Sequence, residues 1–484
     1  MLKNIDKIVD KIKKDTNNDS KIIYRTKFVN HSKIVIIYNE YLTDSDNISD
    51  FIIRSINKIE RKYKNKVDLL STFKNDISMN KIKEVDKYND LMLYLNSGFT
   101  ILLIENNDTA LIFETKKNLF RSVDKPALEN SIRASMDSFN ESIETNIGLV
   151  KRRIKSPDMW VKEYKIGKYT STNVSLVYIN SICKKEIVDY VDKLLNKINI
   201  DGIVNIGEIK NLIEKETKSI FPTIILTERP DNVASSLLKG KIAIFVDNSP
   251  FALIIPAVLN DYFILSEDTF GKNINTSFTR VIRYMAFFIS LLTPAIYIAL
   301  ITYNFEILPT VLIANLASQR EVVPFPAYFE AIIMIIAFEI LRESDLKIPN
   351  FASSALSIVG ALILGEAAVN AGLISPIMII VISITAISAL SFSEPEIINA
   401  LRWYRLIFML GACFMGIVGV VIVFLFLLIR LSSLESFGKP YLMPYVPINK
   451  EGLKNSIIQF PFKKIKKRES YLSNNIVKMG DMDD

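Results

Sequence analysis

Glu366 and Asn370 are the residues whose types and spacing most directly suggest chemistry. They lie four residues apart in SIVGALILGEAAVNAGLISP (residues 357–376), where the other residues are small or apolar. A spacing of four places both side chains on one face of a helix. A carboxylate is costly in hydrocarbon and usually marks an ion or substrate path, although a neutral, hydrogen-bonded structural glutamate is the alternative. We therefore interpret Glu366 and Asn370 as candidate ion-path residues.

The same stretch carries a row of small residues on a neighbouring face. Ala361, Gly365, Ala368 and Gly372 follow one another at intervals of four, three and four residues. Small residues allow helices in a membrane to approach closely. The pattern predicts that this face packs against another helix while the adjoining face presents oxygen atoms to a subunit interface or a pore.

The surrounding sequence contains several apolar segments that would position these residues. Four are long and apolar enough to cross a bilayer of about 30 Å, namely residues 281–303, 325–343, 375–392 and 404–431. The second segment holds two further candidate ion-path residues, Glu330 and Glu339. Residues 353–374 are predicted to form a broken or re-entrant element, which is tolerated only inside protein or along a water-filled cavity.

Basic residues flank the apolar region at both ends. Lys272, Arg280 and Arg283 lie at its start, and the run KKIKKR (residues 463–468) follows it. Two cytoplasmic flanks require an even number of crossings, so we predict four passes with a re-entrant element. This topology places Arg402 and Arg405 on the far side, which counts against it. The KKIKKR run is interpreted as an anchor to anionic membrane lipids rather than a nucleic-acid site.

The region before the apolar segments has the composition of a soluble domain. Residues 1–280 are rich in Lys, Asn, Ile and Asp, and the N-terminus has no apolar core of a signal peptide, so a cytoplasmic location is predicted. Cys183 and Cys413 lie in different regions and are not expected to form a disulfide. With His31 as the one histidine, we expect no histidine-based metal site or Ser-His triad. We predict no enzymatic activity, no cofactor and no metal.

Two segments of this region resemble each other. GFTILLIENNDTALIF begins at Gly98 and GKIAIFVDNSPFALII at Gly240, and both are typical of a β-hairpin. The fold class predicted is an α/β cytosolic domain of two related subdomains, an α-helical polytopic membrane domain and a short basic C-terminal tail. The predicted boundaries are 1–125 (first subdomain), 126–169 (helical linker), 170–270 (second subdomain), 271–431 (membrane domain) and 432–484 (cytosolic tail).

Longer runs resemble a known family, the A subunits of the GerA family of bacterial spore germinant receptors. The matching runs span about residues 140 to 468 and include TNIGLVKRRIKSP, TERPDNVASSLLKGKIAIFVDNSPFALIIPA, REVVPFP, FEILRES, SIVGALILGEAAVNAGLISP, NALRWYR and SFGKPYLMPYVP. One departure lies in the second apolar segment, where Ile335 stands at a position that is typically Glu in the family.

The resemblance implies a multi-pass protein of the spore inner membrane with a cytoplasmic N-terminal domain. It implies self-association, with a pentamer expected, and two partners, a transporter-like B subunit and a C-subunit lipoprotein. Nutrient binding would open an ion channel that releases monovalent cations and begins germination.

Three other interpretations stay open at the level of sequence. The chain is alternatively a non-channel scaffold of a germination complex, a secondary transporter, or a late-sporulation accessory paralogue (stage V sporulation AF-like). The paucity of crossings and the absence of an inverted repeat argue against a transporter. Neighbouring genes for a B and a C subunit would favour the receptor over the accessory paralogue.

Overall fold

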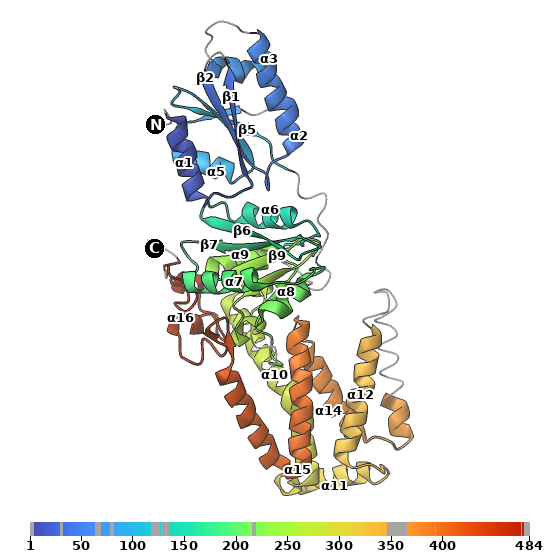
Figure 1. Ribbon diagram of the computed structural model, residues 1–484. Helices are drawn as coiled ribbons and strands as arrows, with labels where there is room; N and C mark the ends of the chain where they lie inside the picture. Colours follow the sequence, from blue (N-terminus) through green and yellow to red (C-terminus); the bar gives the residue numbers. More distant parts are fainter. Residues whose placement is uncertain are drawn as a thin grey trace.

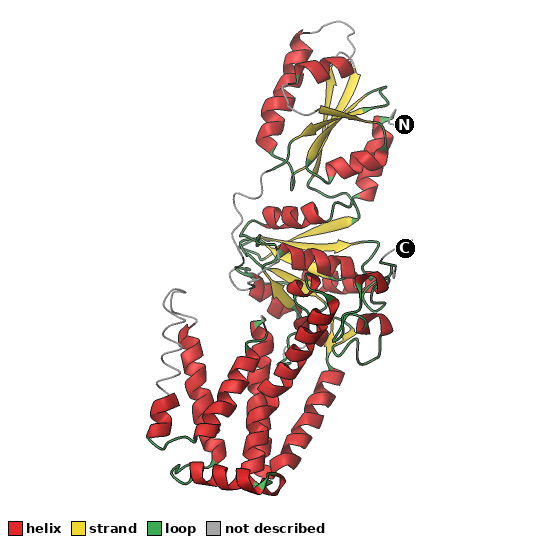
Figure 2. Cartoon of the chain, turned by 180° about the vertical axis from the view of Figure 1, so that it is seen from behind, coloured by secondary structure: helices red, strands yellow, loops and turns green. Residues whose placement is uncertain are grey.

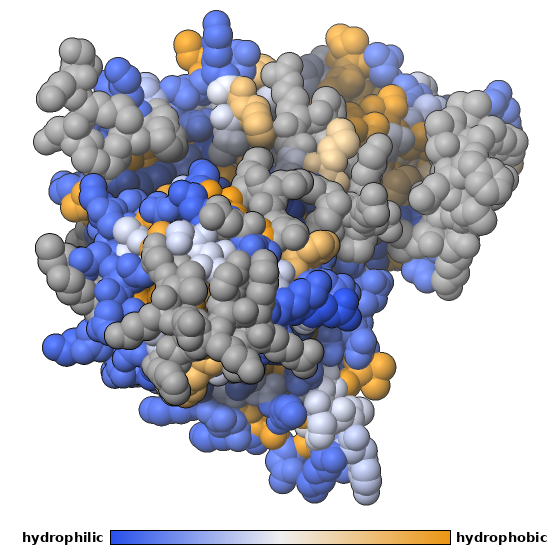
Figure 3. Space-filling model, turned by 90° about the horizontal axis from the view of Figure 1, so that it is seen from above, coloured by the Kyte–Doolittle hydropathy of each residue, from blue (hydrophilic) through white to orange (hydrophobic). Residues whose placement is uncertain are grey.

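The computed structural model describes most of the chain, and every structural statement below concerns these residues: 4–29, 32–62, 69–77, 82–117, 126, 129, 135–214, 219–345, 365–392, 394–475 and 477–478. Three parts follow one another along the long axis of the molecule, two α/β domains and then a group of long helices (Figures 1 and 2). The described surface at the N-terminal end is mainly hydrophilic (Figure 3).

The first α/β domain is a five-stranded antiparallel sheet with strand order β1-β2-β4-β5-β3. Helices cover both of its faces, so successive residues such as Ile34, Val35, Ile36 and Ile37 are all buried. Its elements are α1 (Ile5–Asp15), β1 (Ile22–Val29), β2 (Ser32–Asn39), α2 (Ser45–Asn47), η1 (Ile48–Ile53), α3 (Arg54–Lys62), α4 (Leu69–Asp76), β3 (Ile82–Val85), α5 (Tyr88–Leu95), β4 (Phe99–Ile104) and β5 (Ala110–Glu114).

The second α/β domain has the same topology, with strand order β6-β7-β9-β10-β8. Gly98 and Gly240 both have positive φ before the matched hairpins, as do Asn106 and Asn248 in the turns. Its elements are α6 (Ile143–Arg153), β6 (Met159–Ile166), β7 (Thr172–Ile179), α7 (Lys185–Lys197), α8 (Ile206–Ile213), β8 (Ile225–Thr227), α9 (Pro230–Lys239), β9 (Ile242–Val246), β10 (Ala252–Ile255), η3 (Leu259–Phe263) and η4 (Ser266–Thr269).

The predicted linker 126–169 is wrong in part, because β6 lies inside it. This strand pairs with β7 along its full length, so the second sheet begins before the predicted boundary at residue 170. Its sequence MWVKEYKI mixes apolar and charged residues, and only its first and last residues are buried. An edge strand with one exposed face has this composition.

Buried polar contacts join the two α/β domains. Lys151 Nζ lies 2.6 Å from Asp19 Oδ2, and both side chains are 5% exposed. Tyr41 donates its hydroxyl to Glu163 Oε1 (2.9 Å), and Lys151 lies over the Tyr41 ring. Since a buried charge is tolerated only when it is paired, these contacts hold the domains in one arrangement.

The C-terminal segment packs against the second α/β domain instead of extending away from it. Asn474 N donates to Ile182 O (2.9 Å), and Ser436 Oγ donates to Thr223 O (2.8 Å). The C-terminal end lies beside this domain in Figure 1. The segment contains β11 (Glu435–Ser436), β12 (Lys439–Pro440), α16 (Lys450–Leu453) and η6 (Phe462–Lys464).

Among the described residues, α10 and α15 of the helical part are the two helices that are long and apolar enough, by length and composition, to cross a membrane. At 1.5 Å per residue, the 30 residues of α10 measure about 45 Å, which matches a bilayer with its headgroups. Its elements are α10 (Asn273–Thr302), η5 (Phe305–Ile307), α11 (Thr310–Arg320), α12 (Ala327–Asp345), a short helix at 365–370, α14 (Pro376–Ala389) and α15 (Pro395–Ser433).

α15 is a hairpin of two helical arms and not one straight helix. Gly416 has φ 60° and ψ −138°, a conformation that favours glycine, and the chain reverses there (Figure 1). The arms touch through glycine, because a Cβ at Gly419 would collide with the carbonyl of Gly411. Asn304, just beyond α10, accepts a hydrogen bond from Ile417 N (3.1 Å) and so holds the turn at that end.

The predicted single crossing at 404–431 is therefore wrong. The first arm starts beside the second α/β domain, where Glu396 contacts Lys210, and the second arm returns to it. Arg402 and Arg405 lie along the first arm and not at the far end, which removes the difficulty that they posed for the predicted topology. The predicted re-entrant element 353–374 falls mostly outside the described residues.

Large apolar side chains cover the outside of the hairpin. Phe414, Phe426 and Ile429 are 74%, 58% and 69% exposed, although they belong to an almost entirely apolar helix. An apolar surface of this extent is not stable against water. The surface therefore faces lipid or another protein.

Candidate functional site

Glu366 and Asn370 lie on one exposed face of the short helix at 365–370. Within the described part of the chain, neither side chain has a hydrogen bond or an ion pair. The helix ends in a Schellman motif, in which Leu373 N donates to Ala368 O (3.0 Å) and Gly372 N to Val369 O (2.9 Å). Both polar side chains are thus available to whatever covers this face, and their role in an ion path stays a prediction.

The small residues that were predicted to form one packing face have different environments in the structure. Gly365 is buried, and a Cβ at this position would lie 3.7 Å from Ile379 on α14. Ala368 packs against the apolar core of the helical part. Gly372 has φ +67° and terminates the helix, so the backbone conformation favours glycine at this position independently of packing. Ala361 lies outside the described residues.

Glu330 is fully buried at the end of the helical part that is remote from the α/β domains. Its Oε1 lies 3.1 Å from Arg320 Nη2, and its Oε2 accepts hydrogen bonds from Ser375 N (3.0 Å) and Ser375 Oγ (2.9 Å). These contacts tie α11 and α12 to the start of α14. Because its charge is neutralised and both oxygens are bonded, Glu330 has the environment of a structural residue.

Glu339 is also paired, at the opposite end of α12. Its Oε1 lies 3.0 Å from Arg402 Nε, and the pair borders a cavity of about 460 Å³ between α12 and α15. Arg405, one turn further along α15, is buried and donates Nε to Ser290 O (2.9 Å). Of the predicted ion-path carboxylates, Glu366 alone lacks a partner among the described residues.

The pairing of these carboxylates had only a partial signal in the sequence. Arg320 lies ten residues before Glu330, so a local ion pair was open to prediction from charge complementarity. Ser375 is 45 residues from Glu330, and its hydrogen bonds have no sequence signal. The same holds for Glu339 and Arg402, which meet only because the fold brings the second half of α12 within reach of the first arm of α15.

A buried ion cluster connects α10 to the second α/β domain. Asp268 Oδ2 accepts from Arg280 Nε (2.7 Å) and Asp268 Oδ1 from Arg283 Nη2 (2.9 Å). Arg280 also donates Nη1 to Asn455 O (3.2 Å) and Ser456 O (2.9 Å) of the C-terminal segment. Arg280 and Asp268 are 2% exposed. The cluster thus joins α10 both to the second α/β domain and to the C-terminal segment.

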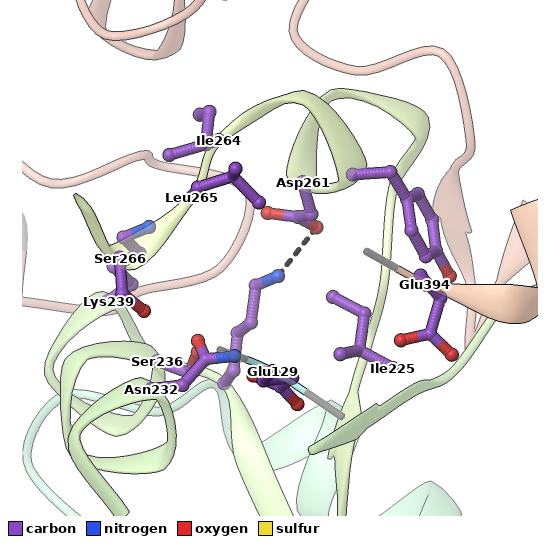
Figure 4. A pocket seen from close by; sticks show the side chains of 12 residues that line it. Glu129, Ile225, Asn232, Ser236, Lys239, Asp261, Ile264, Leu265, Ser266 and Glu394 are labelled. Atoms are coloured by element: carbon purple, nitrogen blue, oxygen red, sulfur yellow. Dashed lines mark hydrogen bonds and ion pairs between the residues drawn. The ribbon is translucent and has the colours of Figure 1, made fainter. Parts of the chain in front are cut away.

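A charged cavity of about 80 Å³ lies where the second α/β domain meets the start of α15. Figure 4 shows Glu129, Asp261 and Glu394 around it, and the dashed line marks the ion pair of Asp261 with Lys241 Nζ (2.6 Å). Burial raises the pKa of Glu129 to about 7. Burial, followed by repulsion from Glu396, raises the pKa of Glu394 to about 8. This junction therefore gains negative charge as the pH rises through neutrality.

The described residues contain no group of three or more His, Cys, Asp or Glu side chains arranged to hold a metal ion. Cys183 and Cys413 are both free, and burial raises the pKa of the Cys183 thiol to about 12. Fold and sites together describe a protein of two α/β domains joined to an apolar helical part, and the two long apolar helices of the described residues fit association with a membrane.

Comparisons with known proteins specify this class further. The family model "Bacillus/Clostridium GerA spore germination protein" matches residues 10–471. Spore germination protein KA of Bacillus subtilis (strain 168) is 37% identical over 480 residues, covering 98% of this chain and 88% of that protein. Spore germination protein GerLA of Bacillus cereus is 34% identical over 443 residues, covering 91% of this chain and 89% of that protein. The chain belongs to the GerA family of spore germination proteins.

The chain is also similar to a further membrane protein and to a solved domain structure. The membrane protein YfkQ of Bacillus subtilis (strain 168) is 34% identical over 453 residues, covering 92% of this chain and 87% of that protein. The crystal structure of the N-terminal domain of the A subunit of the Bacillus megaterium spore germinant receptor GerK3 is 34% identical in sequence. The structural match covers 52% of this chain and 94% of the GerK3 domain, with a TM-score of 0.41.

Proposed function

We propose that this chain is the channel-forming A subunit of a spore germinant receptor. In this role it oligomerises, as a pentamer, around a central path, and nutrient binding to the complex opens the path to monovalent cations. The observation that carries the proposal is the contrast among the membrane carboxylates. Glu330 and Glu339 are neutralised by arginine, whereas Glu366 is exposed and unpaired beside Asn370 in the described helix.

A ring of such glutamates, repeated by the symmetry of an oligomer, would attract cations. Gly365 and Ala368 on the inner side of the same helix pack against α14 and the apolar core, which supports a fixed orientation for the outward-facing oxygens. Asn370 adds a neutral oxygen one turn away. The exposed apolar surface of α15 supplies area for lipid and for the partners, a transporter-like B subunit and a C-subunit lipoprotein.

We further propose a multi-pass arrangement in the spore inner membrane, with both α/β domains in the cytoplasm. The arginines of the helical part support this orientation, because most of them lie toward the α/β domains, as the positive-inside rule requires. These are Arg280, Arg283, Arg342, Arg402 and Arg430, whereas Arg405 lies midway along the first arm of α15 and Arg320 lies at the other end. The hairpin in α15 replaces one predicted crossing by two, so α10, α12, α14 and the two arms would make five crossings. The even number expected from the basic flanks then requires one more crossing, which the segment predicted as re-entrant (353–374) would have to supply.

Cysteine labelling tests this arrangement. In a chain with Cys183 and Cys413 replaced by serine, Phe270→Cys and Glu435→Cys should react from the same side of the membrane. Phe305→Cys should react from the other side, because η5 follows the far end of α10. All three positions are exposed, so a membrane-impermeant maleimide reports the side and not burial. Reaction of residues 270 and 305 from one side would show that α10 does not cross.

The channel itself is tested by cation flux. The chain, purified together with its B and C partners and placed in liposomes, should release trapped potassium when nutrient is added. Liposomes with the B and C partners but without this chain are the control. Saturable nutrient uptake by this chain alone would instead indicate a transporter. An assembled complex that binds nutrient without any flux would indicate a scaffold.

A further inference from the structure

The charged cavity of about 80 Å³ lies at the joint between the second α/β domain and the first arm of α15 (Figure 4). Three carboxylates from separate parts of the chain border it. Glu129 precedes α6, Asp261 belongs to η3, and Glu394 is the N-cap residue of α15. A proton that binds or leaves here therefore acts on the α/β domain and on the helix at the same time.

Asp261 is the carboxylate of this group whose charge is compensated. Its Oδ2 accepts hydrogen bonds from Lys241 Nζ (2.6 Å) and Val258 N (2.8 Å), and the Lys241 side chain is 2% exposed. Lys239, the other lysine that borders the cavity, is attracted by Asp261 and by Glu469. The two lysines of the lining are therefore associated with Asp261.

Glu394 has no cation of its own. Among the described residues its side chain has no hydrogen bond and no ion pair, and it does not cap α15. Lys210 of α8 attracts it, but Lys210 forms its ion pair with Glu396, on the same helix as Glu394. Burial, followed by repulsion from Glu396 and from Glu129, raises the pKa of Glu394 to about 8.

Glu129 is only weakly compensated. Its Oε1 accepts a hydrogen bond from Glu228 N (3.3 Å). Arg229 attracts it, but Arg229 Nη2 pairs with Asp231 Oδ2 (2.8 Å), and the Glu228 carboxylate repels it. Burial is the largest effect and raises the pKa of Glu129 to about 7, although a hydrogen bond with Thr227 acts in the opposite direction. Two carboxyl groups of this joint therefore change their charge near neutral pH.

We propose that Glu129 and Glu394 form a proton-operated switch at this joint. With protons bound to the two carboxyl groups the joint is closed, and release of these protons to the surrounding water weakens the contact between the second α/β domain and α15. The physical cause is repulsion between like charges in a small space with few compensating cations. The switch does not depend on what the helices conduct, so it is independent of the proposed channel function.

The direction of the pH dependence follows from where the protons are held. The folded chain keeps them at pH values at which carboxyl groups of the unfolded chain, with an ordinary pKa of 4.5, have lost them. The stability that the bound protons contribute is therefore complete below about pH 4.5 and is lost as the pH rises to about 8. The joint should weaken with rising pH and not with falling pH.

Thermal unfolding of the full-length chain in detergent tests the switch. Glu394→Gln carries no charge, so its midpoint should equal that of the unmodified chain at pH 6 and exceed it by about 3 °C at pH 8.5. Glu129→Gln should act in the same direction, because glutamine keeps the oxygen that accepts Glu228 N. Glu435→Gln, at an exposed carboxylate of the C-terminal segment, is the control and should follow the unmodified chain. If neither Glu394→Gln nor Glu129→Gln differs from the unmodified chain at pH 8.5, the proposal is overturned.

A distance measurement then reports the joint itself. Spin labels are placed at Leu212→Cys in α8 and Asn399→Cys in α15, two exposed positions, in a chain with Cys183 and Cys413 replaced by serine. The distance distribution should be longer or broader at pH 8.5 than at pH 6, and this difference should disappear with Glu394→Gln. An unchanged distribution in the unmodified chain would overturn the switch. A change that persists with Glu394→Gln would assign the pH dependence to other groups and would overturn it as well.

Discussion

Glu366→Lys is expected to abolish nutrient-triggered cation release while the chain still assembles with its partners. A positive charge in place of the glutamate repels cations at each position of a symmetric ring. Glu366→Gln keeps the size of the side chain and removes its charge, so cation flux should fall about tenfold or its cation preference should change. The measurement is potassium and sodium flux from liposomes that contain the assembled complex.

The control for this experiment is Glu306→Gln. Glu306 is an exposed glutamate of η5 in the same helical part, but it does not lie on the helix at 365–370. It should leave flux within about twofold of the unmodified chain, because surface charges in water interact weakly. If the Glu366→Gln complex assembles with unchanged flux and selectivity, Glu366 is structural. The path would then have to be sought elsewhere, first beside Glu339 and its cavity.

Asp268→Asn should destabilise the chain more than any surface substitution. Asp268 is the common partner of Arg280 (2.7 Å) and Arg283 (2.9 Å), and its own side chain is 2% exposed. Loss of its charge leaves two guanidinium groups facing each other without compensation. Breaking a buried ion pair on one side costs about 3–5 kcal/mol. The measurement is the unfolding midpoint of the purified chain in detergent.

Two further variants separate the ion cluster from a general effect of substitution. Glu435→Gln changes an exposed carboxylate of the C-terminal segment and should leave the midpoint unchanged. The double variant Asp268→Asn with Arg280→Met should be more stable than Asp268→Asn alone, because it removes one of the uncompensated charges. A double variant that is less stable than either single variant would show that packing, and not charge, is the dominant contribution of these residues.

Local hydropathy was sufficient to predict the positions of most long helices in the helical part. The segments 281–303, 325–343 and 375–392 coincide with α10, α12 and α14, although α10 begins eight residues earlier. The earlier start has a physical reason. The first turns of α10 contain Asn273, Thr276 and Arg280, which do not look like a membrane helix, and Arg280 is buried only because Asp268 neutralises it.

The hairpin in α15 was missed because hydropathy does not change where the chain turns. Residues on both sides of Gly416 are equally apolar, so a window of 20 residues shows one uninterrupted segment. The turn depends instead on tertiary contacts. Gly411 and Gly419 allow the arms to approach, and Asn304 bonds the backbone at Ile417. None of these contacts is visible from the composition of the segment itself.

The sequence by itself determined which stretches are apolar, where the matched hairpins lie, and that Glu366 and Asn370 share a helix face. These features depend on a residue and its near neighbours, since both transfer free energy and helical spacing are local properties. Only the tertiary structure decided which carboxylates are paired. Glu339 meets Arg402, and Glu330 meets Ser375, because the fold brings segments distant in sequence together. The free energy of a buried charge depends on what surrounds it, and that is a property of the whole fold.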